Sequence, residues 1–265
     1  MAALVFIFGL AIGSFLNVLI VRLPDKKSIR GFSKCPKCRA GINWYDNVPV
    51  LSFLFLKGRC RNCGTKISFQ YPSVELLTAF LFLFSFFAYS GDSSFFFFVL
   101  FLVGLLTAVA FIDLDRFLIL DNFILAGFFV SALYFSFYFF ASPPPDCRIL
   151  SCSAASSVFG SLFFGGSLLF LFLLTKGRGM GLGDVNLGAF LGFIFGFKNS
   201  ANVFVTAFLI GFVVAIILLT FKKAGLKSKV PFGSIIAAAG ILFLLSGFNL
   251  FDLAAADLIL RLWSR

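Results

Sequence analysis

The chain has 265 residues, of which 60% are apolar and 12% are charged, and its net charge is +11. Soluble domains carry about 25% charged residues, and a globule of this size could not bury 43 Phe side chains. The composition therefore excludes an ordinary soluble enzyme and indicates a polytopic membrane protein. The absence of His also excludes every catalytic mechanism and metal site that needs an imidazole.

The apolar segments predict an all-α fold with about eight transmembrane helices, because a hydrocarbon core about 30 Å thick needs about 20 apolar residues per helix. Their approximate ranges are 2–23, 74–90, 94–112, 122–141, 153–175, 187–197, 202–221 and 232–245. The sixth is short. The four-Phe run at 95–98 is interpreted as facing lipid, and the segment 251–263 as an interfacial helix or a ninth span. We expect three parts, at residues 1–23, 24–73 and 74–265.

The basic residues predict the orientation of the chain. Eleven of the 22 Lys and Arg lie between residues 22 and 66, and seven more lie in every second loop after that one. Basic residues collect in cytoplasmic loops, so we expect the N-terminus outside and the first loop in the cytoplasm. The positive charge is explained by this topology and by attraction to anionic membrane lipids, and nucleic acid is not an expected partner.

The first loop contains four cysteines in the pattern C-x2-C-x21-C-x2-C, namely Cys35, Cys38, Cys60 and Cys63. This spacing is just longer than that of the usual four-thiolate zinc site. We expect a structural Zn²⁺ that supplies folding free energy to a short polar loop. A redox dithiol, or reduced cysteines without metal, is the alternative. Cys147 and Cys152 form a separate pair on the expected outer side, where an oxidising compartment could join them.

Two groups of carboxylates lie at the expected cytoplasmic ends of apolar segments. Asp113, Asp115 and Asp121 follow the third segment, and Asp184 opens the sixth in the sequence Gly-Met-Gly-Leu-Gly-Asp. An ionisable residue at membrane depth indicates function. The simpler alternative is that the glycines serve packing and that the Asp184 carboxylate only stabilises a helix N-terminus.

A pair of adjacent carboxyl groups shares one proton, so one can activate a water molecule while the other polarises a carbonyl. This chemistry hydrolyses peptide bonds without Ser, Cys or His. Asp113 is the expected partner of Asp184 because it ends an apolar run, whereas Asp115 stands beside Arg116 and is expected to be solvated. A transporter or channel with carboxylate cation sites is the alternative function, although such sites usually lie near the bilayer centre.

Further motifs surround these residues, at 13–24, 44–52, 58–63, 71–77 and 231–233. In this order the motifs resemble those of the prepilin peptidases, or type IV leader peptidases, which are membrane aspartyl proteases of the GxGD kind. The resemblance covers nearly the whole chain and implies that Asp113 and Asp184 are catalytic, in a transmembrane peptidase domain at 74–265. It also implies cleavage of the short basic leader of prepilin or pseudopilin precursors at the cytoplasmic face of the bacterial inner membrane.

The resemblance further implies N-methylation of the new N-terminal residue with S-adenosylmethionine as the methyl donor. Glu75 stands near the cysteine loop, where pairing with a cytoplasmic Arg is the simpler interpretation and contact with the methyl donor the alternative. Many members of the family carry Lys where this chain has Asn186. Gly13 and Asn17 share a helix face, which predicts an interhelical hydrogen bond from Asn17. The sequence specifies neither the particular precursor nor the oligomeric state.

Overall fold

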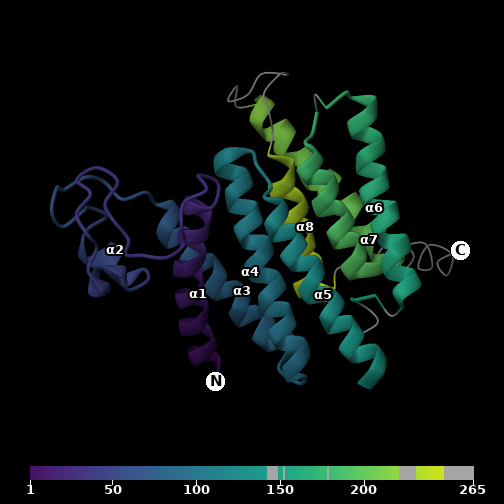
Figure 1. Cartoon of the computed structure of the whole chain (residues 1–265), viewed down its shortest axis with the longest axis horizontal. Coiled ribbons are helices and arrows are strands. Elements are labelled where there is room, and N and C mark those ends of the chain that lie inside the picture. The colour runs from purple at the N-terminus through teal and green to yellow at the C-terminus, as the bar shows by residue number, and fades with distance from the viewer. Residues whose placement is uncertain (142–148, 152, 178, 221–230, 248–265) are drawn as a thin grey trace, which may run out of the picture. The chain divides into compact units, whose positions relative to one another are not determined.

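The computed structural model describes residues 1–141, 149–151, 153–177, 179–220 and 231–247 (Figure 1). Within these ranges the regular secondary structure is helical, and strand-like pairing is limited to two isolated bridges, Lys34 with Gly41 and Arg59 with Lys66. The all-α prediction is therefore confirmed. The chain divides into two compact units, Met1–Ile112 and Asp113–Arg265.

The first unit is built on two membrane helices that approach closely through glycine. Its elements are α1 (Ala2–Arg22), the 3₁₀ turn η1 (Trp44–Asn47), α2 (Leu51–Phe55), α3 (Gln70–Tyr89) and most of α4 (Ser93–Arg116). A Cβ atom on Gly13 of α1 would lie 2.7 Å from the Cα atom of Glu75 on α3. This close approach lets the Asn17 amide donate a hydrogen bond of 3.0 Å to the Tyr71 carbonyl. The predicted interhelical bond of Asn17 is confirmed.

The second unit packs its helices around α7. Its elements are α5 (Asp121–Ala141), α6 (Ala154–Leu174), α7 (Leu182–Thr220) and α8 (Phe232–Ser246). Helices α5, α6 and α8 all contact α7. Gly160 of α6 and Gly192 of α7 face each other so closely that a Cβ on Gly160 would touch the Gly192 carbonyl oxygen. Small residues allow this approach between helices within a membrane.

Helix α7 is interrupted at Gly196, whose φ of 72° and ψ of 177° are not helical. A straight helix of 39 residues would be about 58 Å long, roughly twice the hydrocarbon thickness. The two arms therefore correspond to the sixth and seventh predicted segments. The Ser151 N–H donates a bond of 2.9 Å to the Ile194 carbonyl just before the interruption, which satisfies a carbonyl that the break would leave without a helical partner.

Six helices in the described ranges are long and apolar enough to cross a membrane, and α8, with 15 residues, is shorter. All eight predicted apolar segments are helical where they are described, with α7 counted as two arms. The chain is thus a multi-pass membrane protein. Within the four-Phe run, Phe95 and Phe98 are buried, so the interpretation that the whole run faces lipid is wrong. Cys147, Cys152 and the segment 251–263 lie outside the described residues.

Candidate active site

The two carboxylates singled out by the sequence stand at helix ends and are both buried. Asp113 lies in the last turn of α4, and Asp184 lies in the first turn of α7. Their exposed fractions are 5% and 7%. Both residues belong to the second unit, so the site they form is contained in one compact part of the chain.

The surroundings of Gly233 show that the carboxylates of Asp113 and Asp184 lie close together. A Cβ atom built on Gly233 would lie 3.0 Å from Asp184 Oδ1 and 3.1 Å from Asp113 Oδ2. The two carboxylate oxygens therefore lie no farther than about 6 Å from each other. A separation of this size can be bridged by one water molecule lying between the two carboxyl groups, which is the arrangement that the sequence analysis expected for Asp113 and Asp184.

Backbone N–H groups hold each carboxylate in place. The Ser234 N–H, in the first turn of α8, donates a bond of 2.6 Å to Asp113 Oδ2. The Gly181 N–H, directly before α7, donates a bond of 2.8 Å to Asp184 Oδ2. N–H groups at helix N-termini have no partner within their own helix, so they are free to bind a buried carboxylate. The sequence analysis noted the motif at 231–233, which contains Gly233, without assigning it a role at the site, and did not single out Ser234.

Side chains around the pair close and brace the site. A Cβ on Gly183 would lie 2.8 Å from the Ile119 Cβ, so this glycine lets α7 approach the chain between α4 and α5. The Asn186 amide donates a bond of 3.1 Å to Asp121 Oδ1 at the start of α5. Asp115 is exposed and pairs with its neighbour Arg116 at 3.0 Å, which confirms that it is solvated and stands apart from the buried pair.

The four cysteines of the first unit form one cluster, with all four sulfur atoms within 4.8 Å of one another. The sulfurs of Cys35 and Cys63 are 3.8 Å apart, and tetrahedral Zn²⁺ with Zn–S bonds of about 2.3 Å holds thiolates about 3.8 Å apart. The donor set therefore fits a tetrahedral metal ion. The N–H groups of Cys38 and then Lys37 lower the pKa of the Cys35 thiol to about 6. The pKa of Cys38, which the Ala40 N–H lowers but burial and the neighbouring sulfurs raise, is about 11, so the thiolate that a metal requires is favoured at Cys35 first.

An ion pair ties the second cysteine turn to η1. The Arg61 guanidinium contacts both carboxylate oxygens of Asp46, at 2.6 and 2.9 Å, and lies 5.4 Å from the ring centre of Tyr45. The hydrogen bond from Arg61 lowers the pKa of Asp46 below its ordinary value. The pair thus stays charged at neutral pH and holds η1 against the segment that carries Cys60 and Cys63.

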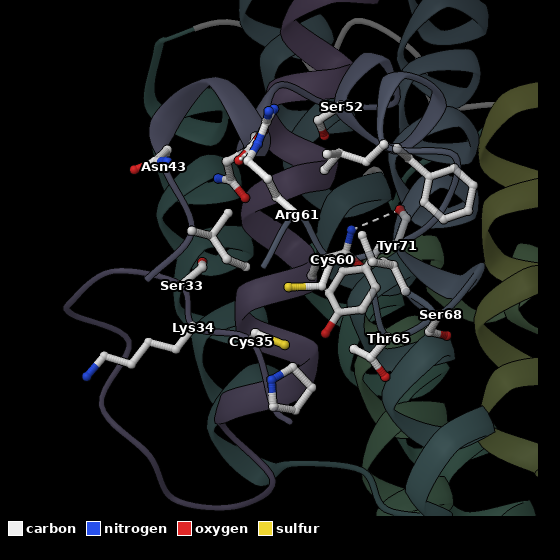
Figure 2. Close-up of a pocket in the computed structure, with 18 of the residues that line it drawn as sticks. Ser33, Lys34, Cys35, Asn43, Ser52, Cys60, Arg61, Thr65, Ser68 and Tyr71 are labelled. Carbon is white, nitrogen blue, oxygen red and sulfur yellow. Dashed lines mark hydrogen bonds and ion pairs between the residues drawn. The ribbon is translucent and has the colours of Figure 1, made fainter. Parts of the chain in front are cut away.

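A cavity of about 600 Å³ lies between this loop and the helices α1 and α3 (Figure 2). Its lining includes Asn17, Cys35, Asp46, Cys60 and Glu75. Small-molecule sites usually measure about 300–1,000 Å³. Figure 2 shows the Lys34 side chain extending away from the other drawn side chains. With a volume of about 600 Å³, the cavity is large enough for a small organic ligand.

The Glu75 carboxylate faces this cavity and accepts a bond of 2.8 Å from the Val50 N–H. Val50 has a φ of 61°, a conformation that is rare for β-branched residues and that needs support from its surroundings. No Arg pairs with Glu75 in the described part of the chain, so the simpler interpretation of Glu75 was wrong about its partner. Val50 was missed because nothing in its sequence context marks a strained residue.

Comparison with known proteins identifies the family. Residues 7–89 match the family model described as the bacterial peptidase A24 N-terminal domain, and residues 100–219 match that of the type IV leader peptidase family. The chain is 35% identical to a prepilin leader peptidase/N-methyltransferase of Bacillus subtilis, over 93% of this chain and 95% of the relative. The chain belongs to the type IV leader peptidase family. No solved structure matches.

The chain is similarly close in sequence to other members of the type IV leader peptidase family. A prepilin leader peptidase/N-methyltransferase of Myxococcus xanthus is 35% identical over 86% of this chain, which spans 66% of that relative. One of Pseudomonas aeruginosa is 31% identical over 91% of this chain and 89% of the relative. The range matched to the leader peptidase family contains both Asp113 and Asp184. Gly233 and Ser234 lie beyond it.

Replacing Gly233 with Ala is expected to reduce peptidase activity by about a hundredfold, because displacing catalytic groups by about 1 Å has this effect. The new methyl group would push against Asp113, Asp184 and the Ile119 side chain, whose Cδ1 lies 2.5 Å from the Cβ position. The measurement is the rate of precursor cleavage in proteoliposomes. Gly211→Ala is the matched control, since its Cβ has only ordinary contacts, the nearest at 3.5 Å. Full activity of Gly233→Ala would contradict the geometry described for the pair.

Proposed function

We propose that this protein is a membrane aspartyl endopeptidase whose catalytic pair is Asp113 and Asp184, and that it removes the leader of prepilin-like precursors. The observation that carries the proposal is the approach of both carboxylates to the single point beside Gly233. The curated relatives are named for prepilin leader cleavage. The alternative of a transporter has less support, because both aspartates stand at helix ends rather than near a bilayer centre.

The chemistry needs the two carboxyl groups to share one proton. The ionised carboxylate removes a proton from a water molecule held between the two carboxyl groups, and the water oxygen forms a bond to the carbonyl carbon of the scissile peptide. The protonated carboxyl group meanwhile donates to the carbonyl oxygen. The C–N bond then breaks: the leaving nitrogen takes the proton held by one carboxyl group, and a hydroxyl of the tetrahedral intermediate gives its proton to the other as the new carboxyl product forms, so that the pair again holds one proton.

We propose that the site opens to the cytoplasm of a bacterial inner membrane, with the N-terminus outside. The support is the basic first loop, because positive residues are retained on the cytoplasmic side. Prepilin or pseudopilin precursors are the proposed substrates, since the relatives are named for prepilins. Their cleavage would take place where a precursor meets the membrane surface.

We propose that the cavity of the first unit binds S-adenosylmethionine and that residues 24–73 form the methyl-transfer part of the protein. The methyl donor carries its transferable methyl group on a positively charged sulfur. The carboxylates of Glu75 and Asp46 in the lining are suited to that charge, and the volume suits a nucleoside. The relatives are also named as N-methyltransferases.

We propose that Cys35, Cys38, Cys60 and Cys63 hold a structural Zn²⁺. Four thiolates complete a tetrahedral site and leave no position for a substrate. Cys35 and Cys60 also line the cavity, so these ligands would fix part of its wall. The ion would order a loop that has few buried apolar side chains of its own.

Asp113→Asn and Asp184→Asn are each expected to reduce cleavage by at least about a hundredfold, the usual contribution of a general acid or base. The assay measures the release of the leader from a prepilin-like precursor in proteoliposomes. Asp115→Asn is the matched control, because this exposed neighbour is paired with Arg116 and should keep nearly full activity. Cleavage at the normal rate by either single variant of the pair would reject the proposed mechanism.

Glu75→Gln is expected to weaken binding of S-adenosylmethionine about tenfold, or about 1.4 kcal/mol, while leader cleavage continues at its normal rate. Gln keeps an oxygen that can accept the Val50 N–H, so the backbone there should remain supported and only the charge is lost. Binding is measured by calorimetry on the purified protein. Unchanged affinity would mean that Glu75 serves only to hold Val50.

Purified protein is expected to contain one zinc ion per chain by elemental analysis, and Cys38→Ser combined with Cys63→Ser is expected to lose it. The reason is that two of the four thiolate ligands would be missing. Cys147→Ser combined with Cys152→Ser is the control and should retain the metal. Zinc content that is the same in both double variants would place the metal elsewhere.

A further inference from the structure

The loop of the first unit presents a set of large apolar side chains that the described part of this unit leaves exposed. The exposed fraction is 82% for Trp44, 84% for Phe55 and 71% for Phe69. Leu51 and Leu54 are also exposed. We call these five residues the apolar patch. Exposed apolar areas of this kind mark sites of interaction with a protein or a membrane.

The members of the apolar patch lie on connected elements. Leu51, Leu54 and Phe55 are spaced three and four residues apart on α2, so they share one helix face. The turn η1, which carries Trp44, contacts α2. Phe53, on the opposite, cavity-lining face of α2, packs its ring against that of Phe69 at 6.1 Å. Trp44 and the exposed face of α2 thus lie on two elements in contact, and Phe69 lies on the other side of α2, at the end of the loop that enters α3.

The position of the patch in the chain limits what can cover it. The loop leaves the membrane helix α1 after Arg22 and re-enters the membrane through α3, which begins at Gln70. Phe69, a member of the patch, is therefore the residue next to a membrane-spanning helix. The same loop also carries Trp44 and Tyr45, and Trp and Tyr are enriched at the interface between lipid and water.

The charge of the loop complements an anionic surface. Residues 23–69 contain ten Lys and Arg and two Asp. Both Asp are engaged in ion pairs, Asp25 with Lys27 at 2.7 Å and Asp46 with Arg61 at 2.6 Å. The loop therefore carries a large net positive charge. Lys57 and Arg59, which directly follow α2, are exposed, and basic residues beside a bilayer bind anionic headgroups.

We propose that the apolar patch docks on the surface of a bilayer that contains anionic lipids. Trp44, Leu54 and Phe55 insert at headgroup depth, and Lys57 and Arg59 bind lipid phosphates. The turn η1 joins this contact to the cavity, because it carries Trp44 on the patch and Asp46 and Asn47 on the cavity lining. Lipid docking would therefore hold one wall of the cavity. The proposal is independent of the cleavage chemistry assigned to Asp113 and Asp184.

The test uses Trp44 as the reporter. The chain has two Trp residues, so Trp263→Phe leaves Trp44 alone in the full-length protein. This variant is reconstituted into vesicles of phosphatidylcholine with or without phosphatidylglycerol, together with lipids brominated near the headgroup or near the chain end. We expect strong quenching of Trp44 emission by the shallow bromine, weaker quenching by the deep bromine, and stronger quenching when phosphatidylglycerol is present.

Two sets of variants separate the apolar and the charged contributions. Phe55→Ser with Leu54→Ser should reduce shallow quenching in both kinds of vesicle. Lys57→Gln with Arg59→Gln should remove the dependence on phosphatidylglycerol and keep the remaining quenching. All these side chains are exposed, and circular dichroism checks that the helices remain folded.

Three results would overturn the proposal. The first is strong quenching of Trp44 by acrylamide in vesicles, together with no quenching by either brominated lipid. The second is quenching that is the same in all variants of the patch. The third is acrylamide access that is lost only when a prepilin-like precursor is added, because the patch would then be a protein-binding surface.

Discussion

Two carboxyl groups that meet at the ends of membrane helices must be solvated by the protein, because neither lipid nor a few trapped waters can replace bulk water around them. Here the Ser234 N–H at the start of α8 binds Asp113, and the Gly181 N–H before α7 binds Asp184. Gly233 lets the two groups approach, since any side chain there would enter the space between them. The start of α8 is therefore as much a part of the site as the aspartates themselves.

The first unit meets a different constraint, which is to order a polar loop that has little core. The cysteine cluster, the pair formed by Arg61 and Asp46, and the bond from Val50 to Glu75 each connect segments distant in sequence. The same residues line the cavity, apart from Val50 and the two more exposed cysteines. The groups that fold the loop are thus the groups that shape its binding space, so loss of a metal ion or of the ion pair would disturb the cavity as well as the fold.

Much of this organisation could be predicted from the sequence because it depends on residue type and spacing. The apolar runs predicted the helices, and the C-x2-C pairs predicted the cysteine cluster. The position of Asp113 after an apolar run predicted that it is the partner of Asp184. Backbone N–H groups leave no such signature, which is why Ser234 was not foreseen. Phe95 and Phe98 were assigned to lipid because lipid and a neighbouring helix are equally apolar. The break in α7 at Gly196 also has little signal, since apolar residues continue on both sides.

Asn186 shows how a departure from the family pattern can preserve an interaction. The resemblance to the family implies a Lys at this position in many members, whereas the amide of Asn186 donates to Asp121 on α5 in this chain. A Lys there would be placed to pair with the same carboxylate, which is exposed, and exposed ion pairs add only about 0–1 kcal/mol. The neutral hydrogen bond therefore keeps most of the benefit, which is the link between the start of α5 and the start of α7 beside the aspartate pair. In this chain a neutral donor supplies that link without a positive charge beside the aspartate pair.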